Sequence, residues 1–268
     1  MPRFFTSVLM CALWLALWLT AACGPAPRPG LDLSGYRLLD MTHTFSKETL
    51  YWPTGERFEH GQVAWGKTAG GFWYSSFTYG ANEHGGTHLD APIHFAEGTR
   101  SVDQIPLDQL VGPAVVIDVT AGARGDADYL VSVADIEAFE KQHGAIEPET
   151  IVLIRSGWGG YWPDAKKYLG SDAPGDVENL HFPGVSAEAA QVLVARKVAV
   201  VGIDTASIDY GATRDFPAHQ ALAAAEIAIL ENVAQLDELP VKGAYLFALP
   251  MKIGGGSGGP CRIVALVK

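Results

Sequence analysis

The sequence predicts an α/β protein with a mixed sheet, folded as one domain from about residue 31 to the C-terminus. Apolar runs rich in β-branched residues alternate along the chain with segments of helical periodicity, which is typical of α/β folds. Residues 72–79 are rich in aromatic and Ser/Thr side chains, which favours an antiparallel strand and hence a mixed sheet. After residue 30 we find no linker, low-complexity run or internal repeat that would divide the chain further.

The first 30 residues are expected to lie outside this domain. Residues 1–22 carry one basic residue, Arg3, and an apolar run that is too short for a comfortable membrane span but suits a signal peptide. The run ends in small residues directly before Cys23, as in a bacterial lipoprotein signal, so Cys23 would be lipidated. Residues 23–30 then form a Pro/Gly tether. The prediction is an exported lipoprotein, periplasmic or membrane-anchored; ordinary signal cleavage and an uncleaved anchor helix are the alternatives.

Four apolar runs predict the strands, and three segments between them predict the helices. The strands are expected at 114–119, 151–154, 198–203 and 263–267. Ser132 caps the first helix, with Asp135 three residues on and Gly144 as its stop. A second helix starts at Ser186 and runs toward residue 196, and an Ala-rich third helix covers about residues 221–233.

Charge argues against one class of partner. Acidic residues number 30 and basic residues 19, for a formal net charge of -11. Because the chain has no Lys/Arg cluster, it offers no electrostatic footprint for a phosphate backbone. Nucleic-acid binding is therefore not expected.

One segment concentrates the residues that carry chemistry. It reads His84-Gly-Gly-Thr-His88-Leu-Asp90-Ala-Pro-Ile-His94-Phe, in a chain with only 8 histidines. Imidazole and carboxylate ligands suit Zn²⁺ and, with more oxygen, Mn²⁺. His88 and Asp90 are two residues apart, so an extended backbone presents both on one side. Gly85 and Gly86 would let the chain turn so that His84 can join them.

This pattern resembles the signature of the metal-dependent cyclase/hydrolase family, whose members include bacterial kynurenine formamidases and isatin hydrolases. Weaker similarity extends over most of the chain, including the segments 40–43, 51–53, 112–118 and 202–207. The resemblance implies the swivelling β/β/α cyclase fold with a mixed sheet, and a homodimer. It also implies that His84, His88 and Asp90 ligate a divalent metal, with Asp90 able to bridge two ions, and that His94 is the acid/base group.

The resemblance places three further site residues at a distance along the chain. His219 and Glu231, 12 residues beyond it, fit the later histidine and glutamate of the formamidase pattern. Glu226 on the same predicted helix is the alternative to Glu231. If one ion is bound instead of two, His219 would be a proton-relay or substrate-facing residue. Trp52 corresponds to a tryptophan that packs on an aromatic substrate, with a role in the core as the alternative.

The ligand set and the resemblance together predict a hydrolase. A divalent ion, Zn²⁺ or Mn²⁺, would lower the pKa of its bound water to about 7. The resulting metal-bound hydroxide would cleave the C–N bond of a small aromatic amide, either an isatin-type cyclic amide or an N-formylkynurenine-type formamide. His94 would take the proton and return it to the leaving nitrogen. The alternatives are a lactone or cyclic-ester hydrolase and a non-catalytic metal- or solute-binding lipoprotein.

Overall fold

The computed structural model describes residues 33–268, and Tyr36–Lys268 form one compact unit. The predicted signal peptide (1–22), the lipidation site Cys23 and the tether (23–30) lie outside the described residues. Among the residues described, no helix is long and apolar enough to cross a membrane.

Eight strands form a mixed sheet, and seven of them close into a barrel. Their order is β1-β12-β11-β5-β7-β9-β10-β4, and β12 also pairs with β4. The long strand β12 closes the barrel, because it pairs with β11 along one edge and its first residues pair with β4 on the other edge. Its last residues pair with β1. The strands are β1 (Arg37–Asp40), β4 (His88–Asp90), β5 (Val111–Asp118), β7 (Ile151–Arg155), β9 (Val200–Ile203), β10 (Ala228–Glu231), β11 (Lys242–Pro250) and β12 (Gly258–Val267).

The predicted mixed sheet is confirmed, although a different segment makes it mixed. β5, β7, β9 and β10 run parallel, whereas β1, β4, β11 and β12 pair antiparallel with their neighbours. The predicted aromatic strand exists as β3 (Trp73–Gly80), but it pairs only with β2 (Glu59–Lys67) in a separate hairpin. A further short pair joins β6 (Leu130–Val131) to β8 (Gly184–Val185).

Two helices begin where their capping residues predict. Ser132 and Asp135 form a capping box at α3 (Val133–His143), and Gly144 with a φ of 84° ends that helix. The Ser186 side chain accepts the Ala189 N–H at the start of α5 (Ala187–Ala195). The remaining helices are α1 (Leu107–Leu110), α2 (Thr120–Ala123), α4 (Ala165–Leu169), α6 (Pro217–Ala224) and the 3-10 turns η1 (Pro92–His94), η2 (Val102–Gln104), η3 (Trp158–Tyr161) and η4 (Leu236–Glu238).

The prediction of one Ala-rich helix over 221–233 was wrong. Helix α6 lies earlier in the chain, at Pro217–Ala224, and the apolar residues after it form strand β10. Glu226 adopts a left-handed φ of 61° between the two elements, which reverses the chain. The run Ala228–Leu230 is then fully buried between β9 and β4, an environment that overrides the helical preference of alanine.

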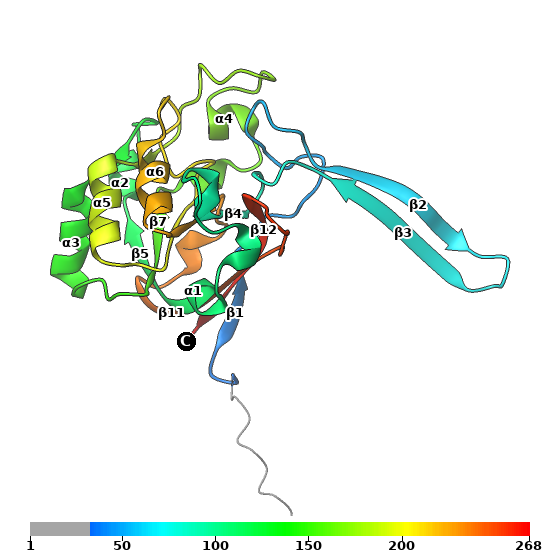
Figure 1. Ribbon diagram of the computed structural model, residues 1–268, viewed down its shortest axis with the longest axis horizontal. Coiled ribbons are helices and arrows are strands. Elements are labelled where there is room, and N and C mark those ends of the chain that lie inside the picture. Colours follow the sequence, from blue (N-terminus) through cyan, green and yellow to red (C-terminus); the bar gives the residue numbers. More distant parts are fainter. Residues whose placement is uncertain (1–32) are drawn as a thin grey trace, which may run out of the picture. The chain divides into compact units, whose positions relative to one another are not determined.

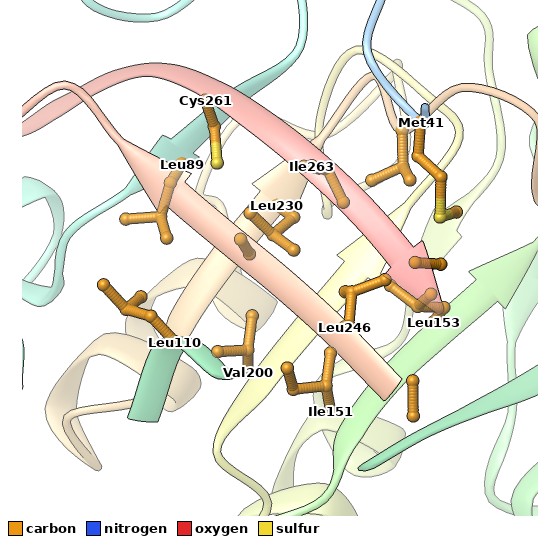
Figure 2. Packing of buried hydrophobic residues seen from close by; sticks show 14 of the residues in the cluster. Met41, Leu89, Leu110, Ile151, Leu153, Val200, Leu230, Leu246, Cys261 and Ile263 are labelled. Atoms are coloured by element: carbon orange, nitrogen blue, oxygen red, sulfur yellow. The ribbon is translucent and has the colours of Figure 1, made fainter. Parts of the chain in front are cut away.

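The side chains of the parallel strands alternate between two hydrophobic cores. Inside the barrel, Val116 of β5 and Leu153 of β7 belong to a core that Figure 2 shows from close by. On the outside, Val115 and Ile154 belong to a second core beneath α3, α5 and α6. Figure 1 shows these helices along one side of the sheet. The antiparallel part of the barrel, formed by β1, β12 and β11, contributes its inward side chains to the first core.

Candidate metal centre and its pocket

Strand β4 presents His88 and Asp90 on the same side, as their spacing predicts. Leu89 between them points into the barrel core and is fully buried. The neighbouring strand β10 places Glu231 directly beside His88 in register. All three polar side chains are at most 5% exposed. The Nε2 atom of His88 lies 3.1 Å from an Asp90 oxygen and 3.4 Å from a Glu231 oxygen.

The glycine pair before β4 turns the chain as predicted. Gly86 has a φ of 57°, and a Cβ atom on it would lie 2.7 Å from the Phe45 ring. A Cβ atom on Gly85 would lie 2.0 Å from the ring of Tyr51. This close-packed turn brings His84 back to the strand, where its Nδ1 atom lies 2.6 Å from Oδ1 of Asp90.

His219 reaches the same carboxylates from helix α6. Its Nε2 atom lies 3.2 Å from Oδ2 of Asp90 and 3.2 Å from Oε1 of Glu231. On its other side, Nδ1 lies 2.7 Å from Oδ2 of Asp209. The Asp209 carboxylate is itself fixed, because it accepts the backbone N–H groups of Ala218 and His219.

In His84, His88 and His219, the ring nitrogen that points away from the carboxylates of the cluster donates a hydrogen bond. In the neutral imidazole, the other ring nitrogen then faces these carboxylates with a free lone pair. The Nδ1 of His88 donates to the Gly86 carbonyl, and the Nδ1 of His219 donates to Asp209. Ser257 donates its hydroxyl proton to Glu83, so Oγ of Ser257 accepts from Nε2 of His84. Donor bonds of this kind orient metal-binding histidines.

The cluster therefore fits a bound cation. In the neutral state, three nitrogen lone pairs would face the oxygens of Asp90 and Glu231, which is an electrostatic arrangement that requires positive charge between them. The buried Nε2 of His88 has no hydrogen-bond partner, although carboxylate oxygens lie close by. Two groups in the described chain have the geometry of a metal site: His84 with His88 and Asp90, and Asp90 with His94 and His219.

Without a metal ion, protons supply that positive charge. Burial by itself lowers the pKa of His88, but the nearby carboxylates of Asp90 and Glu231 raise it to about 9. Burial by itself also lowers the pKa of His219. Its hydrogen bonds to Asp209 and Asp90 outweigh burial and raise this pKa well above the ordinary value. Protons and a divalent ion therefore compete for the same nitrogen atoms.

This competition predicts that metal affinity increases with pH. Because the raised pKa keeps His88 protonated at pH 7 in the metal-free protein, binding must release that proton. The association constant should increase by about tenfold per pH unit for each proton released, and level off above about pH 9. Titration of the metal-free chain with Zn²⁺ between pH 6 and pH 9 measures this slope. An affinity independent of pH in this range would contradict binding through His88.

His94 lies beside the cluster, at the end of η1. Its ring stacks on that of His84, with ring centroids 3.8 Å apart and an interplanar angle of 15°. Burial lowers the pKa of His94 to about 4, so its imidazole is neutral at pH 7 and can accept a proton. The acid/base role of His94 stays a prediction, and its position next to the carboxylates is compatible with it.

An aromatic pocket opens above the cluster, with a cavity volume of about 280 Å³. His84, His88, Asp90, His94, His219 and Glu231 all line it, as does Trp52. The Trp52 ring packs edge-on against Phe216 at 6.0 Å, and Phe95 contacts Phe216 at 5.5 Å. Trp52 thus contributes to the pocket wall and also packs on buried Phe182.

The two candidate glutamates lie in different parts of the structure. Glu231 is buried in the cluster, where Oε1 also accepts the backbone N–H of Ile208. Glu226 forms an ion pair with Arg100, which lies outside the pocket that Glu231 lines. Glu231 therefore lies where the predicted distal carboxylate should be, although it is on a strand and not on the predicted helix.

Sequence reasoning missed the residues that orient the histidines. Asp209 and Ser257 contact His219 and His84, yet neither stands in the signature segment. Ser257 belongs to the glycine-rich stretch 254–260, a composition typical of a turn. Its position beside His84 depends on the pairing of β12 with β4, which is a contact between distant parts of the chain.

A closed mixed barrel with this ligand cluster in an aromatic pocket suits a metal-dependent hydrolase of small molecules. The chain belongs to the Cyclase family: the family model described as "Putative cyclase" matches residues 39–210. The expected family and fold class are thereby confirmed.

The relatives agree with this assignment. The isatin hydrolase of Roseibium aggregatum is 35% identical over 193 residues, which cover 69% of this chain and 72% of the relative. The kynurenine formamidase of Salinibacter ruber is 32% identical over 235 residues, covering 85% and 96%. Isatin hydrolase A from Labrenzia aggregata, solved with benzyl benzoate, superposes with a TM-score of 0.80 at 33% identity, covering 89% and 96%. Because these relatives are hydrolases of amide C–N bonds, the prediction that the chain is a hydrolase is confirmed.

Proposed function

We propose that the protein hydrolyses the C–N bond of a small aromatic amide, using a divalent ion held by His84, His88, Asp90, His219 and Glu231. The observation that carries this proposal is the convergence of these five side chains at one end of an aromatic pocket. The ion is Zn²⁺ or Mn²⁺, since both accept imidazole and carboxylate ligands. Such an ion lowers the pKa of a coordinated water to about 7 and polarises a carbonyl oxygen.

The protein side chains supply binding and proton transfer. The rings of Trp52, Phe95 and Phe216 provide apolar faces that suit a planar aromatic substrate. Neutral His94 takes the proton that the attacking water releases and returns it to the leaving nitrogen. The products are a carboxylate and an amine. Asp209 and Ser257 keep His219 and His84 oriented during this sequence.

An isatin-type cyclic amide is the first candidate substrate, and an N-formylkynurenine-type formamide is the second. A cavity of about 280 Å³ is close to the lower end of the range for small-molecule sites, which suits a compact bicyclic ring. The relative named isatin hydrolase supports the first candidate, and the relative named kynurenine formamidase supports the second. An aromatic lactone is the alternative, because the same polarised carbonyl chemistry opens either ring.

A comparison of three substrates tests the proposal. The purified chain, loaded with Zn²⁺ or Mn²⁺, should open isatin with the highest kcat/KM, hydrolyse N-formylkynurenine less efficiently, and act weakly on an aromatic lactone. Preference for the lactone would replace the amide assignment by the ester alternative. No turnover of any of the three by the metal-loaded chain would contradict the proposed substrate class.

Replacing Trp52 with alanine should affect substrate binding more than chemistry. The loss of one aromatic contact is expected to raise KM by about tenfold, with a smaller change in kcat. Steady-state kinetics with the preferred substrate measures both constants. A variant with unchanged KM would show that Trp52 acts in the core alone, through its contact with Phe182.

We also propose that the protein is exported and anchored by a lipid on Cys23, on the basis of the small residues that precede this cysteine. The Cys23→Ser variant should then move from the membrane fraction to the soluble periplasmic fraction. Cys11→Ser is the matched control, because residue 11 would leave with the signal peptide. Fractionation of expressing cells measures the distribution, and an unchanged membrane fraction for Cys23→Ser would contradict the anchor.

A further inference from the structure

Two of the three imidazoles in the cluster are anchored by groups that only accept hydrogen bonds. The Nδ1–H of His88 donates to the Gly86 carbonyl, and the Nδ1–H of His219 donates to the Asp209 carboxylate. Because neither acceptor can act as a donor, each one fixes the tautomer of its histidine. Nε2 of both rings is therefore left with the lone pair that a metal ion needs.

His84 has an anchor of a different kind. Its Nε2 atom lies 2.8 Å from Oγ of Ser257. A hydroxyl can accept a hydrogen bond from a protonated Nε2 or donate one to an unprotonated Nε2, so it is compatible with both tautomers of a neutral imidazole. The tautomer decides whether His84 can bind a metal ion, because its Nδ1 faces Asp90 at 2.6 Å and must keep its lone pair. A further group has to set the direction of the Ser257 hydroxyl.

Glu83 lies where it can set this direction. Its Oε2 atom lies 2.8 Å from Oγ of Ser257 and also accepts the Ser257 backbone N–H at 2.9 Å. An ionised carboxylate can only accept hydrogen bonds, so the hydroxyl proton of Ser257 is directed toward Glu83. The lone pairs of Oγ then face His84 and accept its Nε2–H. Hydrogen bonds to an ionised acceptor are roughly twice as strong as those between neutral groups, which favours this direction.

The fold brings these groups together from two distant segments. Glu83 and His84 directly precede the glycine turn that leads into β4, and Ser257 directly precedes β12, which pairs with β4. The glycine-rich stretch around Ser257 permits the close approach. A Cβ atom on Gly256 would lie 2.8 Å from Oε1 of Glu83, and one on Gly258 would lie 2.7 Å from Cε1 of His84. Side chains at these two positions would displace the carboxylate and the imidazole.

We propose that Glu83 is a positioning residue that fixes the tautomer of His84 through Ser257, so that Nδ1 of His84 is free to bind the metal ion. Neither Glu83 nor Ser257 lines the aromatic pocket, so Glu83 acts through His84 and not on the substrate. This inference rests on the metal ion of the proposed function. It does not depend on which substrate is hydrolysed.

Without an acceptor at residue 83, the two hydrogen bonds would reverse. The Ser257 hydroxyl would be free to donate to Nε2 of His84, and the ring proton of His84 would move to Nδ1. That proton would point at Oδ1 of Asp90, 2.6 Å away, where the carboxylate stabilises it. A metal ion would have to displace the proton before His84 could bind it, so the metal affinity would decrease.

The Zn²⁺ affinity of the purified chain and its variants tests the proposal. Glu83→Leu removes the acceptor and should lower the association constant by about 10- to 100-fold, the range for residues that orient metal ligands. Glu83→Gln retains an amide oxygen that can accept both donors of Ser257, so its affinity should lie within about twofold of wild type. A loss of packing alone would not be rescued by an acceptor at this position.

Asp103→Asn is the matched control. Asp103 accepts the Gly255 N–H of the same glycine-rich stretch at 2.9 Å, but it does not contact Ser257. This variant changes a carboxylate to an amide beside the same stretch and should bind Zn²⁺ as the wild type does.

A double variant tests whether Glu83 acts through Ser257. Ser257→Ala removes the hydroxyl and should also lower the Zn²⁺ affinity. Because Glu83→Leu and Ser257→Ala interrupt the same hydrogen-bonded chain, the double variant should bind within about twofold of the weaker single variant. Fully additive losses would contradict an action of Glu83 through Ser257.

Wild-type affinity in a folded Glu83→Leu variant would overturn the proposal, as would equal losses in Glu83→Leu and Glu83→Gln. Thermal unfolding followed by circular dichroism checks that each variant is folded. A wild-type chain that binds no Zn²⁺ would instead refute the metal site of the proposed function, and the role of Glu83 with it.

Discussion

Replacing Asp90 with alanine should remove metal binding and hydrolysis together. One oxygen of this carboxylate lies 2.6 Å from His84 and 3.1 Å from His88, and the other lies 3.2 Å from His219. The side chain therefore faces all three candidate imidazole ligands. Without it, those lone pairs lose the negative charge that makes the site selective for a cation. Elemental analysis after dialysis should find no metal above background, and kcat/KM should be undetectable.

A control variant separates this effect from the loss of an aspartate outside the cluster. Asp118→Ala removes an aspartate that is 40% exposed and pairs with Arg155 on the surface. That variant should retain both metal and activity, because surface ion pairs contribute little to stability. A folded Asp90→Ala variant with wild-type metal content would refute the ligand role of Asp90.

Replacing His94 with alanine should reduce kcat by about 10²–10⁴-fold, the range for a general acid/base, and leave the metal bound. His94 stacks on His84 at 3.8 Å, so it lies within reach of a reacting group beside the cluster. The anchoring hydrogen bonds of His84, His88 and His219 run to Ser257, Gly86 and Asp209 and not to His94. Measuring kcat and Zn²⁺ affinity on the same preparation checks both the loss of turnover and the retention of the metal.

The same variant distinguishes an enzyme from a non-catalytic metal-binding lipoprotein. His181→Ala is the control, since His181 lies about half exposed beside Asp128 and should affect neither quantity. If His94→Ala changed metal affinity and the wild-type protein showed no turnover, the binding alternative would be supported. Loss of turnover with unchanged affinity would support hydrolysis.

Much of the fold follows from local signals in the sequence. The β-branched runs at 151–154 and 263–267 form strands because both are buried in the sheet, and Ser132 and Ser186 cap helices through short-range hydrogen bonds. Strand β10 was misread because alanine-rich segments favour helix when burial is unknown. Closure of the barrel could not be predicted, since it depends on β12 pairing with both β11 and β4, which is distant in the chain.

Some residues of the candidate site could likewise be predicted from local sequence, whereas others depend on contacts between distant parts of the chain. The spacing of His88 and Asp90 on an extended segment is a local property, so their common side could be predicted. Glu231 could be proposed only from family resemblance, because its position beside His88 depends on the register of β10 with β4. Asp209 and Ser257 carry no local signal, as each acts through a histidine that is distant in the sequence.

The most direct test of the central claim measures metal content and turnover on the same sample. The purified chain should contain close to stoichiometric Zn or Mn by elemental analysis and should open isatin or N-formylkynurenine. Removal of the metal by a chelator should abolish turnover, and readdition of the same ion should restore it. A chain that binds no metal after reconstitution, or that keeps full turnover after complete chelation, would contradict a metal-dependent hydrolase at the His84–His88–Asp90 cluster.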